Sequence, residues 1–196
     1  MINENFIYLG VFLNSLGSIS YAIATLKGKA KPNRVTFFLW ALAPLIAFYS
    51  EVKQGVGIQS LQAFIVGFGP LMVLSASFLN KKSVWKITRF DIICGVLSIL
   101  GLILWLITKV GNIAIIFSIM ADGLATLPTI KKSYNFPQTE SVWIYMSGGV
   151  CSAITLLTIK TWSFPHYAFP TYILIANIIL TSLIWFDFKK LLKTGS

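Results

Sequence analysis

The sequence predicts an all-α polytopic membrane protein with seven transmembrane helices. Of its 196 residues, 56% are hydrophobic and only 11% are charged, and the mean hydropathy is +0.79. A soluble domain holds about 25% charged residues, so this composition excludes an ordinary soluble globule, a disordered tail and a disulfide-stapled secreted module. The placement of 16 basic residues against six acidic ones predicts how the helices are oriented.

Apolar stretches with few or no charges define the expected helices, since about 20 apolar residues cross a bilayer. The second stretch is short, but Arg34 and Glu51 at its ends can reach the interface. Acidic Glu4 precedes the first stretch and no small-residue cleavage site follows it, so we expect a membrane span there rather than a signal peptide. The expected spans are residues 5–26, 35–50, 54–80, 92–108, 110–130, 141–159 and 161–186.

The basic residues fall mainly on one side of the expected bundle. The opposite side carries only Lys53, Lys109 and Lys160. By the positive-inside rule, the N-terminus is expected outside and the C-terminus in the cytoplasm, and Trp162, Tyr167 and Tyr172 are expected at the outer boundary. The charge excess therefore indicates a lipid bilayer as partner and needs no nucleic acid. The thirteen residues on the expected cytoplasmic side are Lys27, Lys29, Lys31, Arg34, Lys81, Lys82, Lys86, Arg89, Lys131, Lys132, Lys189, Lys190 and Lys193.

An internal repeat relates the two halves of the chain. Thr25-Leu26-Lys27 followed by Pro32-Asn33 recurs as Thr129-Ile130-Lys131 followed by Pro137-Gln138, at offsets of 104 and then 105 residues. This offset pairs the first three spans with the last three and leaves the fourth unpaired; a repeat of three helices needs one extra helix if both copies are to run the same way. We therefore expect a single membrane domain over 1–196, with repeats at 5–80 and 110–187 and a linker helix at 90–108. Chance similarity between basic loops is the alternative.

The Pro137-Gln138 pair in an expected cytoplasmic loop, echoed by Pro32-Asn33, resembles the PQ-loop superfamily. That superfamily includes the SWEET/MtN3 sugar transporters, cystinosin-like amino-acid exporters and KDEL-receptor-like proteins. The resemblance covers nearly the whole chain and implies a 3+1+3 helical arrangement with an outside N-terminus. The first copy departs from the family, which more commonly has glutamine where this chain has Asn33.

The resemblance also suggests one binding residue. In SWEET transporters an asparagine in the last helix of a triplet lines the sugar site, and Asn177 occupies that helix of the second triplet. One offset earlier the first triplet has Met72, so a sugar site built on paired asparagines is not implied. Asn14, in the first span, lies at a depth similar to that of Asn177. Both are candidate substrate ligands, with interhelical hydrogen bonding as the alternative role.

Asp122 is the acidic residue that lies deep in an expected span. An ionised carboxylate there costs at least about 2.5–3.5 kcal/mol unless it faces a wet cavity or a partner. The sequence offers no lysine or arginine at that depth as a permanent partner. Asp122 is therefore predicted to bind substrate or couple a proton, with a hydrogen-bonded structural acid as the alternative.

Three aromatic residues and three prolines complete the candidate set. Trp40 and Tyr145 occupy equivalent places in the two repeats, with Trp143 close to the latter, and these rings either stack on a substrate or anchor at the interface. Prolines inside spans remove a backbone donor and are candidate hinges for alternating access, or fixed kinks. They are Pro44, Pro70 and Pro128.

These observations predict a transporter that moves a small polar solute, such as a sugar, an amino acid or a vitamin-like compound, by alternating access. The alternative is a KDEL-receptor-like protein that binds a ligand without moving it. A retinal protein would need a lysine within the last span, and none lies between Lys160 and Lys189. No motif indicates an enzyme, a cofactor or a metal site. Whether a second copy of the chain is a partner stays open.

Overall fold

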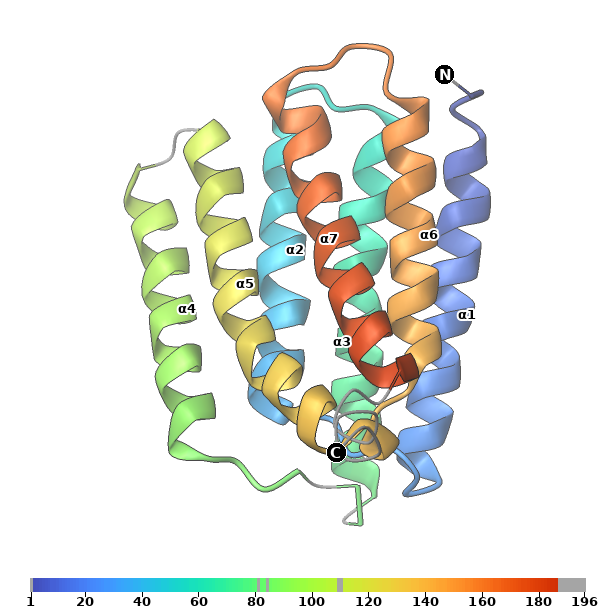
Figure 1. The fold of residues 1–196 in the computed structure, drawn as a ribbon. Coiled ribbons are helices and arrows are strands. Elements are labelled where there is room, and N and C mark those ends of the chain that lie inside the picture. The colour runs from blue at the N-terminus through green and yellow to red at the C-terminus, as the bar shows by residue number, and fades with distance from the viewer. Residues whose placement is uncertain (1, 81, 84, 109–110, 187–196) are drawn as a thin grey trace, which may run out of the picture.

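The computed structural model describes residues 2–80, 82–83, 85–108 and 111–186. Over these residues all of the regular secondary structure is helical, with seven α-helices and two short 3₁₀ turns (Figure 1). The described elements are α1 (Phe6–Leu26), α2 (Arg34–Lys53), η1 (Ile58–Ser60), α3 (Leu61–Leu79), α4 (Arg89–Thr108), α5 (Gly111–Asn135), η2 (Pro137–Thr139), α6 (Val142–Thr158) and α7 (Phe164–Phe186).

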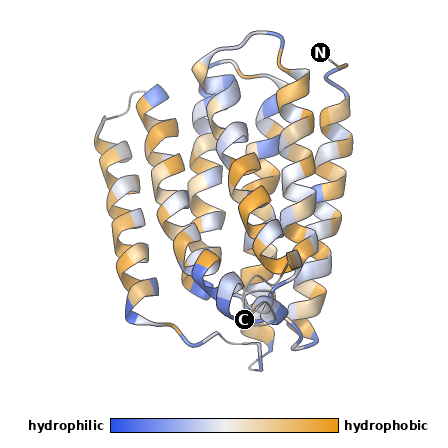
Figure 2. Cartoon of the chain, in the orientation of Figure 1, coloured by the Kyte–Doolittle hydropathy of each residue, from blue (hydrophilic) through white to orange (hydrophobic). Residues whose placement is uncertain are grey.

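The lengths and compositions of the helices suit a bilayer. Five helical segments are long and apolar enough to cross a membrane: α1, α2, Ile58–Leu79, α5 and α7; α6, with 17 residues, is a shorter apolar helix. Large apolar side chains such as Phe12, Val96 and Ile178 are more than half exposed on the outer surface. Figure 2 shows that hydrophobic residues predominate along the helices, with many of the hydrophilic residues toward the ends. A soluble protein does not expose so much contiguous apolar surface, and the fold is that of a multi-pass helical membrane protein.

Neighbouring helices are often distant in sequence. α1 packs against α3 and α6, α2 packs against α3 and α5, and α7 packs against α5 and α6. α4 packs chiefly against α5, with fewer contacts to α2, and lies at the edge of the bundle (Figure 1). Residues from α1, α2, α3, α5, α6 and α7 therefore meet in the middle of the bundle.

One end of the bundle carries the loops after α1, α3 and α5, and we call it the basic end. Its described basic residues include Lys27, Lys82 and Lys86, and it lies at the bottom of Figure 1, opposite the labelled N-terminus. Lys81, Lys109 and the predicted tail lysines Lys189, Lys190 and Lys193 lie outside the described residues. That the basic end faces the cytoplasm remains a prediction from the charge distribution.

The predicted span boundaries differ most from the structure at the end of α5 and the start of α3, while α2 ends at Lys53 rather than 50, α4 begins at Arg89 rather than 92, and α7 begins at Phe164 rather than 161. α5 continues to Asn135, beyond the predicted limit at residue 130, so Lys131 and Lys132 lie on a helix rather than in a loop. The extension carries Lys132 back into the protein, where its side chain finds an acidic partner. The third helix begins later than predicted, after a 3₁₀ turn, because Gly55 adopts a left-handed conformation with φ 77° that interrupts the helix.

Gly17 lies where α1 and α6 approach closely. A Cβ atom at this position would stand 1.9 Å from Ser147 Oγ and 2.9 Å from the Trp143 carbonyl oxygen. We expect Gly17→Ala to push the two helices apart and to lower stability by about 1–3 kcal/mol. Thermal unfolding in detergent should show a lower Tm for Gly17→Ala and little change for the control Gly123→Ala, whose added Cβ would meet Tyr172 at an ordinary 3.8 Å. Equal Tm values for the two variants would contradict this close contact.

Candidate functional site

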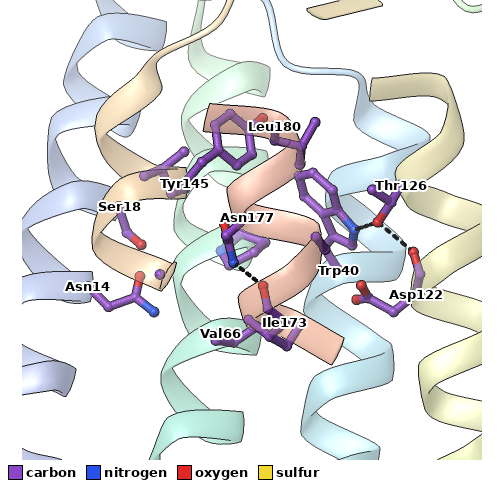
Figure 3. A pocket seen from close by; sticks show the side chains of 14 residues that line it. Asn14, Ser18, Trp40, Val66, Asp122, Thr126, Tyr145, Ile173, Asn177 and Leu180 are labelled. Atoms are coloured by element: carbon purple, nitrogen blue, oxygen red, sulfur yellow. Dashed lines mark hydrogen bonds between the residues drawn. The ribbon is translucent and has the colours of Figure 1, made fainter. Parts of the chain in front are cut away.

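A pocket lies inside the bundle, close to the middle of α1, α5 and α7 (Figure 3). Its volume is about 60 Å³, which is room for a handful of waters at about 10–15 Å³ each. Its walls are mostly apolar, with a few polar side chains converging from different helices, as in a typical small-molecule site. The polar and aromatic lining residues are Asn14, Ser18, Trp40, Asp122, Thr126, Tyr145 and Asn177.

Asp122 forms one wall of the pocket. Its carboxylate Oδ2 accepts a hydrogen bond from the Tyr172 hydroxyl at 2.6 Å, whereas Oδ1 is buried and has no hydrogen-bond partner among the described residues. Thr126 fixes the helix beside it, because its hydroxyl donates to the Asp122 carbonyl at 2.8 Å and accepts from Trp40 Nε1 at 3.0 Å. The carboxylate is thus held by one donor, and its second oxygen is left for a group inside the pocket.

Three polar side chains lie across the pocket from Asp122 (Figure 3). Ser18 is buried on α1, and its Oγ has no hydrogen-bond partner in the described part of the chain. Asn14, one turn away, is also buried. Asn177 donates through Nδ2 to the Ile173 carbonyl at 2.9 Å, and its amide fits against Gly148, where an added Cβ would come within 3.1 Å of Nδ2. This wall therefore offers hydrogen-bonding groups without a full charge.

Two aromatic rings line the pocket on the side of the basic end. Trp40 and Tyr145 meet edge to face, with ring centroids 6.1 Å apart. Phe37 lies 5.2 Å from the Trp40 ring and Tyr21 lies 5.2 Å from the Phe37 ring. The Tyr145 hydroxyl points away from the pocket and donates to Glu140 Oε2 at 2.8 Å.

A buried ion pair lies between the pocket and the basic end. Lys132 Nζ contacts Glu140 Oε1, with the two side chains only 1% and 0% exposed. Tyr21 and Tyr145 both donate to Glu140 Oε2, at 2.7 and 2.8 Å. We call Tyr21, Lys132, Glu140 and Tyr145 the basic-end cluster. The cluster connects α1, α5 and α6 on the side of the pocket that faces the basic end.

The two PQ-type segments meet at the same end. Pro137 begins a 3₁₀ turn, and Asn33 caps α2 by accepting a hydrogen bond from the Val35 amide at 3.1 Å. The Lys31 amide, which precedes Pro32, donates to the carbonyl of Thr139, which follows Gln138, at 3.1 Å. Lys132 Nζ also donates to the Lys31 carbonyl. Both segments therefore support the basic-end cluster rather than the pocket lining.

The structure brings most of the predicted site residues together. Asn14, Asp122, Asn177, Trp40 and Tyr145 all line the pocket. Of the predicted hinges, Pro70 also lines it, whereas Pro44 and Pro128 are buried within α2 and α5 outside the lining set.

Trp143 lies away from the pocket. Its side chain is 57% exposed and lines a groove on the outer surface between α1 and α6. Two residues along an α-helix correspond to about 200° of rotation, so Trp143 and Tyr145 face opposite ways.

Several site residues were not among the predicted ones. Tyr172, expected at the outer boundary, instead contacts Asp122 inside the bundle, about 12 Å along α7 from its first residue. Ser18 and Thr126 were missed, although Ser18 stands exactly one repeat of 104 residues before Asp122. The Lys132–Glu140 pair was missed because both residues border an expected loop. A further proline, Pro170, lies inside α7.

No family model, curated protein or solved structure matches this chain. Within the described ranges no three metal-ligating side chains come together, and Cys94 and Cys151 are separate buried thiols. The fold and the site define a class of protein, namely a multi-pass helical membrane protein with a pocket lined by several polar side chains in the middle of its helical bundle.

Proposed function

We propose that this chain is a transporter that moves a small polar solute across the membrane by alternating access, with the solute bound in the central pocket. The observation that carries the proposal is the Asp122 carboxylate, buried halfway through the bundle with one oxygen unpartnered and facing the pocket. A carboxylate at that depth costs several kcal/mol unless it meets a partner or water. Such a residue is typical of substrate and ion pathways.

The pattern of helix contacts supports two parallel three-helix units. Exchanging α1 with α5, α2 with α6 and α3 with α7 turns each main contact into another: α1–α6 becomes α5–α2, α1–α3 becomes α5–α7, and α2–α3 becomes α6–α7. α4 falls outside this exchange and would be the linker. This symmetry is that of parallel-repeat transporters, whose substrate sites lie near the midplane between the repeats.

Pairs of pocket residues follow the same symmetry. Ser18 and Asp122 are related by the offset of 104, and Trp40 and Tyr145 by the offset of 105. Equivalent positions of the two units therefore both contribute to the lining of the pocket. A solute held between them would follow the rocking of one unit against the other.

The described conformation has the features of a state closed toward the basic end. The pocket accommodates only a handful of waters, less than a sugar or vitamin requires. The basic-end cluster joins α1 of the first unit to α5 and α6 of the second. Opening the pocket toward the basic end, which we propose is cytoplasmic, would require this cluster to separate.

The test is flux. A thermal-shift screen of sugars, amino acids and vitamins on the purified protein would first find a ligand, and uptake of that ligand would then be measured in proteoliposomes. We expect saturable uptake that is absent from empty liposomes. A KDEL-receptor-like protein is the alternative, and it would bind the ligand without moving it. Binding without flux would therefore overturn the transport proposal in favour of that receptor.

A further inference from the structure

The charge balance of the pocket is unusual. Among the described residues, its lining includes one carboxylate, Asp122, and no lysine, arginine or histidine. The nearest buried cation on α5, Lys132, is engaged by Glu140 in the basic-end cluster. Within the described part of the chain, Tyr172 is the titratable side chain that contacts the Asp122 carboxylate, and it supplies a neutral hydrogen bond.

The unpartnered atoms in the lining are oxygens. Asp122 Oδ1 and Ser18 Oγ are both buried without hydrogen-bond partners within the described ranges. A buried polar atom without a partner costs about 1–3 kcal/mol, and more when it carries charge. A ligand with hydrogen-bond donors and positive charge would remove this cost, whereas an anionic ligand would add repulsion to it.

The surrounding rings also favour a cation. The indole of Trp40 and the phenol of Tyr145 line the pocket on the side of the basic end. Aromatic faces attract cations, by about 2 kcal/mol or more once water is excluded. Figure 3 shows Asp122 and Trp40 on one side of the pocket and Asn14 and Ser18 on the other, so a ligand would meet charge at one end and neutral polar groups at the other.

We propose that the solute bound in this pocket is a small organic cation, a protonated or quaternary amine whose positive group pairs with Asp122. This inference rests on the proposed transport function and names its substrate class. The remainder of the solute carries a hydroxyl, amide or carbonyl group that bonds to Ser18, Asn14 or Asn177. Neutral sugars and solutes with a net negative charge are excluded as preferred ligands.

Matched pairs of solutes that differ in charge but little in shape test the proposal. We would compare choline with 3,3-dimethylbutan-1-ol, and ethanolamine with propan-1-ol, by calorimetric titration of the purified protein. The charged member of at least one pair is expected to bind at least about tenfold more tightly than its neutral partner. In Asp122→Asn this difference should vanish.

Glu51→Gln is the matched control variant. Glu51 is also a buried acid, 2% exposed, but it lies at the far end of α2 outside the pocket lining. Its replacement should leave the preference for the cation intact. A melting curve for each variant, compared with that of the unmodified protein, establishes that a loss of binding does not come from unfolding.

The outcomes separate this inference from the proposed function. Equal affinity for both members of each pair, failure of both cations to bind, or a cation preference that survives in Asp122→Asn would overturn the inference. If a neutral solute is carried across proteoliposomes, transport stands and the cation assignment falls. If the cation binds through Asp122 but does not cross, the assignment stands and transport falls.

Discussion

Replacing Glu140 with glutamine is expected to lower the free energy of unfolding by about 3–5 kcal/mol. The reason is the environment of Lys132, whose side chain is 1% exposed and whose ammonium contacts Glu140. Glutamine keeps the shape and leaves the positive charge buried without its counter-ion. Tyr21 and Tyr145, which both donate to Glu140 Oε2, would also lose a charged acceptor. Stability would be measured by denaturant titration of the detergent-solubilised protein.

Two further variants identify the cause of this loss. The double variant Lys132→Met/Glu140→Gln has no buried unpaired charge, so it should be more stable than Glu140→Gln alone. Compared with both single variants in a double-mutant cycle, it measures the coupling energy between Lys132 and Glu140. Glu4→Gln removes the other described ion pair, with Lys160, whose side chains are 45% and 65% exposed. An exposed pair contributes about 0–1 kcal/mol. A loss for Glu140→Gln no larger than that for Glu4→Gln would refute the buried pair.

The basic-end cluster could not be predicted from the sequence. The basic residues near the ends of spans predict orientation as a group, and within that group nothing marks Lys132 as buried. Its burial depends on Glu140 standing eight residues later, beyond the 3₁₀ turn that begins at Pro137, and on two tyrosines from α1 and α6. Contacts of this kind follow from the assembled fold and leave no pattern in the local sequence.

The pocket itself was more predictable. Polar side chains halfway along apolar helices are costly unless they meet partners, and the three residues selected on this ground, Asn14, Asp122 and Asn177, line the same pocket. It missed Ser18 and Thr126, because a hydroxyl can bond to its own helix backbone and so carries little cost there. Thr126 makes such a bond to the Asp122 carbonyl.

For the aromatic residues, the sequence predicted which part of a helix lies near the pocket but not which side chains point into the bundle. Tyr145 and Trp143 are two positions apart, and only the assembled bundle decides which of them turns inward. Tyr172 was assigned to the boundary because tyrosine is common there. Its actual partner, Asp122, belongs to another helix, fifty residues earlier in the chain.

Asp122→Asn is expected to abolish uptake driven by a pH gradient in proteoliposomes. The carboxylate has one free oxygen in the pocket, and either a proton or the positive group of a solute can neutralise it. If Asp122 binds either a proton or the cationic solute, and if the protein exposes Asp122 to the two sides of the membrane in turn, protons are exchanged for the solute. Asparagine keeps the size of the side chain and can still accept from Tyr172, but it binds neither a proton nor a cation.

The measurement uses liposomes whose interior is more acidic than the medium and follows entry of the bound cation. Outward movement of protons should accelerate uptake by the unmodified protein and by Glu51→Gln, the control that removes a different buried acid. In Asp122→Asn, uptake should fall at least about tenfold and should no longer respond to the gradient. An unchanged response to the gradient would show that the proton is carried elsewhere. A pH gradient drives transport only through a group that changes charge within the transport cycle. If Asp122→Asn loses both cation binding and the response of uptake to the pH gradient, the Asp122 carboxylate carries out both cation binding and proton coupling.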